Sequence, residues 1–252
     1  MEKRGPSAYA AEFLGTLLLV FSICTVVSTN SAGGLGYTDF TTIGLVHAFA
    51  LAGLIAAFGA ISGGHFNPAV TIGLLAIKKI RPADAGIYIV IQFVAGILAA
   101  LLVKAVLGDV GHAAHYGAPA ITKTMAAGKN GVPGAFIAEG LGVLFLLLAV
   151  VGTAVAPGGD RRFAPLIIGL ALGLANFVIA PITGGALNPA RAFGPALVGN
   201  AFGGAGTFLL VYILAPIVGA LIAVFAYIAI QGREAELDKR PIDTFDETET
   251  AS

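Results

Sequence analysis

The chain has 252 residues, of which 57% are apolar and only 11% are charged, and its mean hydropathy is +0.91. A soluble domain is typically about 25% charged. Lys and Arg together number 14, and so do Asp and Glu, so the basic excess expected of a nucleic-acid-binding protein is absent. The composition excludes an ordinary cytosolic domain and a disordered chain, and it points to a protein embedded in a lipid bilayer.

Six apolar stretches are long enough to cross a membrane, because a helix of about 20 residues spans the hydrocarbon core. They cover residues 8–28, 42–61, 83–107, 134–156, 165–182 and 207–230. The first stretch is longer than the apolar region of a signal peptide, contains Glu12 and lacks a clear cleavage site. We therefore interpret it as a membrane span.

The positive residues predict the orientation of these spans. If six helices alternate in direction, ten Lys and Arg residues fall on one side of the membrane and only Lys104, Lys123 and Lys129 on the other. Both termini are therefore predicted to lie in the cytoplasm. No organelle signal is visible, which favours the cell membrane. Residues 233–252, with seven acidic and three basic residues, are predicted to form a flexible acidic tail after a membrane-embedded domain of residues 1–232.

Two motifs occur twice along the chain. Ala-Glu-x-Leu-Gly occupies residues 11–15 and 138–142, and Gly-Gly-x-x-Asn-Pro-Ala occupies residues 63–69 and 184–190. Each half, about 8–107 and 134–230, holds three spans. An odd number of spans forces the second copy to enter from the opposite side, and such inverted repeats place functional sites at their interface near the midplane.

The Asn-Pro-Ala segments precede apolar stretches, 70–77 and 191–198, that are too short to cross a membrane. Asn suits a helix N-cap and Pro the first helical position, so each segment predicts a re-entrant half-helix. The fold class is therefore an all-α membrane protein with six transmembrane helices and two re-entrant half-helices. The two Asn side chains should meet near the bilayer centre, where amide donors and helix dipoles would bind a neutral polar molecule and repel cations.

This doubled pattern resembles the aquaporin, or major intrinsic protein, family over roughly residues 8–230. The resemblance implies one pore in each subunit of a homotetramer in the lipid bilayer. It implies passive conduction of water, with ammonia, urea and glycerol as further candidate solutes, and exclusion of protons and ions. The pore motifs would be Asn67, Pro68, Ala69, Asn188, Pro189 and Ala190.

The resemblance also implies a selectivity filter, whose residues follow from their spacing to the motifs. Arg191 lies three residues after Asn188, Gly185 three before it and His47 twenty before Asn67. Asn176, twelve before Asn188, fills the remaining position, although a slip of one residue would place Phe177 or Ala175 there. His47, Gly185 and Arg191 resemble the filter of plant tonoplast aquaporins, and a glycine at 185 predicts a wider opening than in a strict water channel.

Glu12 and Glu139 are acidic residues well inside the spans, at equivalent repeat positions. The resemblance implies that they brace the backbone of the Asn-Pro-Ala loops. A secondary transporter with an inverted repeat would also use such carboxylates, and it remains the alternative hypothesis. His65 is expected to line or support the cytoplasmic vestibule. The spans contain no Ser/His/Asp set and no metal-ligand spacing, so we expect neither an enzyme, nor a metal, nor a cofactor, nor a nucleic-acid partner.

Overall fold

The computed structural model describes residues 4–31 and 39–231, and the regular elements in this part of the chain are all helices. Six are long and apolar enough to span a membrane, which confirms the predicted spans. They are α1 (Pro6–Ser31), α2 (Phe40–Ser62), α4 (Pro82–Ala113), α6 (Gly131–Val150) continued by η2 (Val151–Val155), α7 (Ala164–Thr183), and α9 (Ala205–Phe208) continued by η3 (Leu209–Leu214) and α10 (Ala215–Gln231). The predicted tail lies outside the described residues, and its boundary at 232 remains a prediction.

The span boundaries differ from the predicted ones by a few residues, most of all in α4. This helix continues six residues beyond the predicted end at Leu107. Gly108 has φ 51° and ψ −125°, which is not helical, so the element is kinked where the apolar pattern ends. At the start of α2, Asp39 is the N-cap and accepts a hydrogen bond from the Thr42 amide at 2.9 Å. That hydrogen bond lowers the pKa of Asp39 below its ordinary value.

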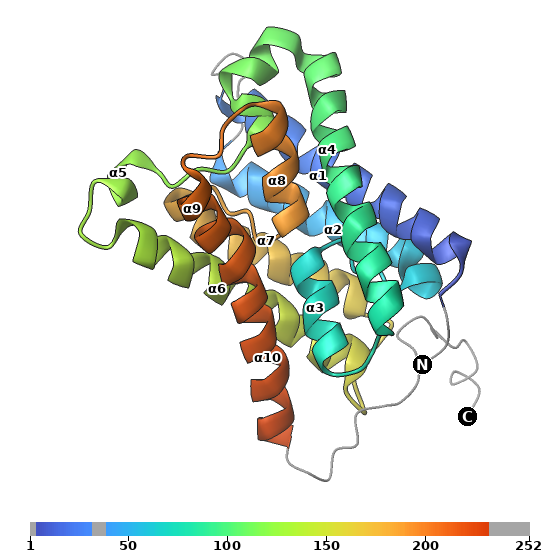
Figure 1. Cartoon of the computed structure of the whole chain (residues 1–252). Coiled ribbons are helices and arrows are strands. Elements are labelled where there is room, and N and C mark those ends of the chain that lie inside the picture. Colours follow the sequence, from blue (N-terminus) through green and yellow to red (C-terminus); the bar gives the residue numbers. More distant parts are fainter. Residues whose placement is uncertain (1–3, 32–38, 232–252) are drawn as a thin grey trace.

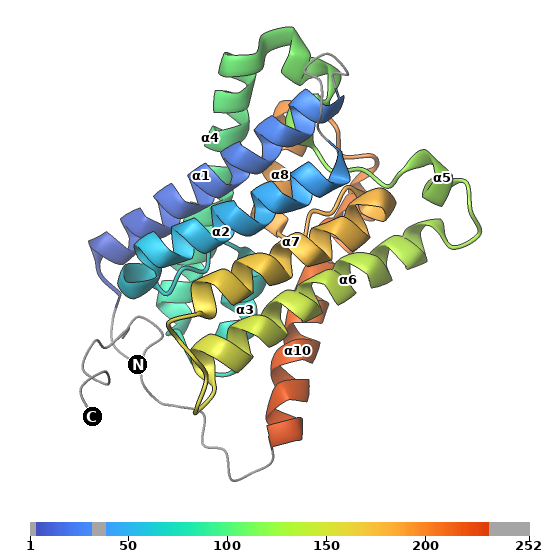
Figure 2. The ribbon, with the colours of Figure 1, turned by 180° about the vertical axis from the view of Figure 1, so that it is seen from behind.

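Two short helices, α3 (Pro68–Ala76) and α8 (Pro189–Val198), follow the Asn-Pro-Ala motifs. The remaining elements are η1 (His115–Gly117) and α5 (Lys123–Ala126), which connect α4 to α6. Seen from behind, α1, α2, α7 and α6 lie side by side in that order (Figure 2). The opposite view shows α4 and α10 in front, with α3 and α8 beside them (Figure 1).

The packing of the helices follows the sequence repeat. Helix α1 packs on α2 and α4, as α6 packs on α7 and α10. Each half-helix also packs against the third span of the other half, α3 against α10 and α8 against α4. Helices α2 and α7 meet between the two halves. The contacts therefore have the two-fold pattern that an inverted repeat requires.

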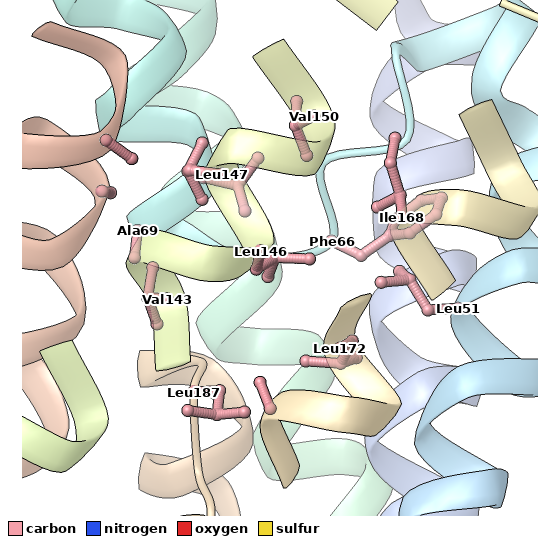
Figure 3. Packing of buried hydrophobic residues seen from close by; sticks show 14 of the residues in the cluster. Leu51, Phe66, Ala69, Val143, Leu146, Leu147, Val150, Ile168, Leu172 and Leu187 are labelled. Atoms are coloured by element: carbon pink, nitrogen blue, oxygen red, sulfur yellow. The ribbon is translucent and has the colours of Figure 1, made fainter. Parts of the chain in front are cut away.

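Apolar side chains cover both the outside and the inside of the bundle. Phe49, Val90 and Ile230 are more than 60% exposed, as expected of membrane-spanning helices, which carry apolar residues on their lipid side as well as on their inner side. Inside, residues of α2, α6 and α7 gather around the loops that carry Phe66 and Leu187 (Figure 3). The same interior holds buried polar residues, and these define the site described below.

Helices α4 and α8 approach each other so closely that their contact requires glycine. A Cβ added at Gly194 would lie 2.1 Å from the Gly96 carbonyl oxygen, far inside van der Waals contact. Because the obstacle is backbone, no side-chain rotation relieves it. Close approach through small residues is how membrane helices gain contact without a hydrophobic driving force.

We expect Gly194→Ala to destabilise the protein by about 1–3 kcal/mol, the usual cost of overpacking, because α8 must move away from α4. The measurement is thermal unfolding of the purified protein in detergent. Gly86→Ala is the matched control, since a Cβ there meets nothing within 4 Å. Equal melting temperatures for the two variants would contradict the close packing of α4 and α8.

Candidate pore site

The two half-helices meet at their N-termini. Asn67 and Asn188 are the N-caps, and their side-chain oxygens accept from the amides of Ala69 at 2.9 Å and Ala190 at 3.0 Å. Each side-chain amide also donates across the repeat, Asn67 to the Leu187 carbonyl and Asn188 to the Phe66 carbonyl, both at 2.9 Å. One proton of each amide group thus remains available to a molecule in the cavity that both side chains line.

The carbonyls that receive these bonds belong to strained residues. Phe66 has φ 47° and Leu187 has φ 53°, in the left-handed region that side chains with a Cβ rarely adopt. The two residues are fully buried and occupy equivalent repeat positions. Such strain persists only where the surroundings over-determine the conformation, and here Glu12 and Glu139 hold the two loops.

Glu12 of α1 holds the first loop and Glu139 of α6 the second. Glu12 accepts hydrogen bonds from the backbone of His65 and Phe66, both at 2.8 Å. It also accepts from the side chains of Ser62 and Gln92 at 2.8 Å. Both carboxylates are completely buried, and every group bonded to them is a donor. They therefore satisfy loop amides that have no water at membrane depth.

Glu139 repeats this arrangement. It accepts from the amides of Ala186 at 2.9 Å and Leu187 at 2.7 Å, and from the Thr183 hydroxyl at 2.5 Å. The Thr183 hydroxyl in turn accepts from the Gly185 amide at 3.1 Å, just as the Ser62 hydroxyl accepts from the Gly64 amide. The structure thus places both glutamates in contact with the loops that the sequence analysis associated with them.

Two further pairs support the loops, and sequence reasoning missed their roles. Tyr88 and Tyr212 donate to the Ser62 and Thr183 carbonyls, each at 2.8 Å. A Cβ added at Gly15 would lie 2.1 Å from the Phe66 ring, and one added at Gly142 would lie 2.4 Å from the Leu187 side chain. Both glycines stand three residues after the repeated glutamate, so their recurrence in Ala-Glu-x-Leu-Gly was the available signal.

His65 lies on the first loop and is 3% exposed. Its Nδ1 lies 3.1 Å from the Thr71 hydroxyl, and its ring packs edge-on against Tyr88. It lines the same cavity as the two asparagines. The second repeat has no counterpart of this polar group, because Ala186 occupies the equivalent position.

Arg191 is fully buried in the first turn of α8. Its Nη1 donates to the Gly117 carbonyl at 2.9 Å, while its Nε and Nη2 have no partner among the described residues. Gly117 belongs to η1, between the third and fourth spans. A backbone carbonyl has no signature in sequence, so this partner could not be predicted from motifs.

His47, Asn176 and Gly185 lie together. The Asn176 amide nitrogen is 3.3 Å from His47 Nε2 and donates to the Gly185 carbonyl at 3.0 Å. The neighbouring Phe177 packs instead over Gly44 of α2, and Ala175 belongs to the apolar core. The assignment without a gap therefore places the polar residue beside the other two.

A glycine at position 185 predicts a wider opening, but the structure places a side chain in the space beside it. A Cβ added at Gly185 would lie 2.4 Å from the Asn176 amide nitrogen. The volume that glycine leaves is therefore filled by the neighbouring amide. Two of the four predicted filter positions thus share one space, which their spacing along the chain does not reveal.

One cavity reaches four of the polar residues described above. It is lined by His47, Asn188, Asn67 and His65, and otherwise mainly by apolar side chains of α1, α2, α6 and α7. Leu51, Leu146, Val150, Ile168 and Leu172 are among these apolar residues (Figure 3). The arrangement is a polar track along an apolar wall. It defines an all-helical membrane protein with a pore-like cavity between two inverted halves.

Comparisons with known proteins agree with this description. The family model described as "Major intrinsic protein" matches residues 3–227, so the chain belongs to the major intrinsic protein family of membrane channels. It is 39% identical over 218 residues to the "Glycerol uptake facilitator protein-like 6" of Lactiplantibacillus plantarum, covering 86% of this chain and 94% of that protein. It is 35% identical over 244 residues to "Aquaporin AqpM" of Methanothermobacter thermautotrophicus, with the same coverage of 86% and 94%.

A solved structure also shares the fold. The X-ray structure of the aquaglyceroporin from Plasmodium falciparum matches with a TM-score of 0.67 and 22% identity, over 87% of this chain and 95% of that one. The chain is thus an integral membrane channel of the aquaporin or glycerol-facilitator kind. These relatives include both kinds, so the family alone does not define the solute.

We expect Glu139→Gln to destabilise the second loop. One oxygen becomes an NH₂ group, which places a donor either against the Leu187 amide or against the Ala186 amide and the Thr183 hydroxyl. An unsatisfied buried group costs about 1–3 kcal/mol, and thermal unfolding in detergent measures the change. Asp160→Asn, in the loop between η2 and α7, is the control. A variant as stable as the wild type would contradict the bracing role.

Proposed function

We propose that this protein is a passive water channel that excludes protons and ions. The observation that carries the proposal is the set of donors left free in an otherwise apolar cavity. Inside the cavity they are one amide proton each on Asn67 and Asn188. The buried Nε and Nη2 groups of Arg191, on α8, also have no partner among the described residues. Water molecules that pass the two asparagines and then Arg191 would find hydrogen-bond donors at both places.

The two asparagines would control the orientation of water. Both offer donors, so a passing water molecule turns its oxygen toward them and its hydrogens away. This orientation interrupts the chain of hydrogen bonds along which a proton would move. The half-helices also direct their positive ends at this point, as in aquaporin-type pores, which adds a barrier to cations.

The width of the filter favours water over larger solutes. His47, Asn176 and Arg191 have no exposed surface, whereas Asn67 and Asn188 are each 4% exposed. The Asn176 amide also occupies the space beside Gly185. Ammonia, urea and glycerol remain candidate solutes, and the tight filter supports the smaller ones before glycerol.

The alternative, a secondary transporter, requires ionisable groups that exchange protons with the pore. Glu12 and Glu139 are fully buried, are surrounded by donors and do not line the cavity described above. Their contacts support a bracing role over proton coupling, and membership of a channel family supports the same choice. Saturable, ion-coupled uptake would favour the transporter.

The proposal also covers the membrane, the orientation and the oligomeric state of the channel. We place it in the cell membrane as a homotetramer with both termini in the cytoplasm. The excess of Lys and Arg on one side supports the orientation, and the family resemblance supports the tetramer. Cross-linking in native membranes would test the oligomeric state.

We expect proteoliposomes that contain the protein to shrink under an osmotic step much faster than empty vesicles. Stopped-flow light scattering measures this rate, and the same preparation should be tested with glycerol, urea and ammonia. The expected order is water first and glycerol last. Rates equal to those of empty vesicles for every solute would overturn the proposed function.

We expect Arg191→Val to admit cations or protons while water permeation continues, because the variant removes the permanent charge from the filter. A pH-sensitive dye inside the vesicles measures proton entry. Arg162→Val is the matched control, since Arg162 is exposed in the loop before α7. Proton entry that is unchanged in Arg191→Val would show that the filter charge does not exclude cations.

A further inference from the structure

A groove of about 430 Å³ opens on the outside of the helix bundle and shares no lining residue with the pore cavity. Residues of α4, α8, α9 and η3 line it, and α8 lies between α4 and α9 (Figure 1). All the lining residues are apolar, and four of them are phenylalanines, Phe93, Phe193, Phe202 and Phe208. Leu209 at its edge is 51% exposed. In a membrane protein, such a surface faces hydrocarbon and not water.

The phenylalanine rings form a continuous aromatic lining. The ring of Phe193 lies 5.5 Å from that of Phe93 and 5.9 Å from that of Phe202, measured between centroids. The other half of the inverted repeat lacks this lining, because Ile217 and Ile72 occupy the positions equivalent to Phe93 and Phe193. The groove is therefore not part of the two-fold scaffold that both halves share.

Lys104 lies on the same face of α4 as Phe93, eleven residues further along. The helix is regular between them, so this separation is about three turns and a rise of about 16 Å. Phe93 lies near the middle of the part of α4 between Pro82 and the kink at Gly108. The hydrocarbon core is about 30 Å thick, so one leaflet is about 15 Å deep. Phe93 is thus at the depth where acyl chains end, and Lys104 is at the depth of the headgroups.

The charge of Lys104 has no acidic partner. Its side chain is exposed, and it makes no ion pair among the described residues. Its Nζ lies 5.8 Å from the centroid of the Tyr116 ring, a contact that orients the ammonium group without neutralising it. A cation at the edge of the hydrocarbon core extends to the headgroup region, where lipid phosphates are the available anions.

We propose that this groove binds an anionic phospholipid from the leaflet on the η1 side of the membrane. One acyl chain lies along the phenylalanines, and the phosphate lies beside Lys104. The apolar lining, the unpaired ammonium group and the separation of one leaflet between them together define this ligand. The inference goes beyond the proposed function and does not depend on it, because lipid binding requires no conduction.

A fluorescent residue at the edge of the groove tests the proposal. The chain contains no Trp, so Leu209→Trp introduces a unique fluorophore that phospholipids with brominated acyl chains quench on contact. One Lys near the membrane surface attracts an anionic lipid by about 1 kcal/mol. In phosphatidylcholine bilayers, half-quenching should therefore need about fivefold less brominated phosphatidylglycerol than brominated phosphatidylcholine.

Leu102→Trp is the matched control. Leu102 is 44% exposed and lies two residues before Lys104, on the opposite face of α4, so both brominated lipids should quench this variant equally. Adding Lys104→Gln to Leu209→Trp should abolish the preference for phosphatidylglycerol. A preference that survives Lys104→Gln, or that Leu102→Trp also shows, would overturn the proposal. So would weak quenching of Leu209→Trp by both lipids, because a second copy of the chain would then cover the groove.

A second measurement leaves Leu209 unchanged. Native mass spectrometry counts the phosphatidylglycerol molecules that the detergent-purified protein retains. The wild type should retain about fivefold more than Lys104→Gln, whereas Lys129→Gln, which removes another exposed cation, should match the wild type. Ala205→Leu should also lose the lipid, because it fills part of the groove and keeps the ammonium group. Equal retention by all four proteins, or a loss confined to Lys104→Gln, would overturn the proposed acyl-chain groove.

Discussion

The structure depends on satisfying the polar groups of two irregular loops at membrane depth. Neither water nor a regular helix can pair the amides of His65, Phe66, Ala186 and Leu187 there, so buried carboxylates do it. The price of burying Glu12 and Glu139 is offset by several donors for each carboxylate. Because the glutamates bind these amides, the carbonyls of Phe66 and Leu187 point to the opposite loop. There they accept hydrogen bonds from the side-chain amides of the two asparagines. The position of both donors in the cavity therefore follows from the glutamates.

Both halves use a buried glutamate to bind the loop amides, but the residues around the two glutamates differ. Gln92 bonds both Glu12 and Thr71 in the first half, whereas Pro216 and Ala192 occupy the equivalent positions in the second. Glu12 thus receives one donor more than Glu139. The first half carries His65 beside the cavity, and the second carries Arg191 and Gly185 of the proposed filter. The shared contacts build the two-fold scaffold, and the differences give the cavity two unlike ends.

Much of this fold could be predicted because its signals are local. Span length follows from bilayer thickness, and the half-helices follow from Asn and Pro at their first positions. The filter is different, because its contacts join distant parts of the chain. Arg191 bonds a carbonyl 74 residues away, and His47 meets Asn176 across 129 residues. Spacing predicted these residues as a filter, but only the fold shows that the Asn176 side chain occupies the space that Gly185 leaves open.

The distribution of buried charge supports the proposal that one pore binds water and repels cations. Each glutamate is surrounded by donors, so its negative charge is directed at the loops and not at the cavity. The side chain of Arg191 instead has one neutral carbonyl as its hydrogen-bond partner among the described residues. Its positive charge makes no ion pair among the described residues. A cation would meet that charge and then the positive ends of two half-helices, while a water molecule meets donors that suit its oxygen. The buried carboxylates can stabilise the scaffold because their oxygens are turned away from the path of the solute.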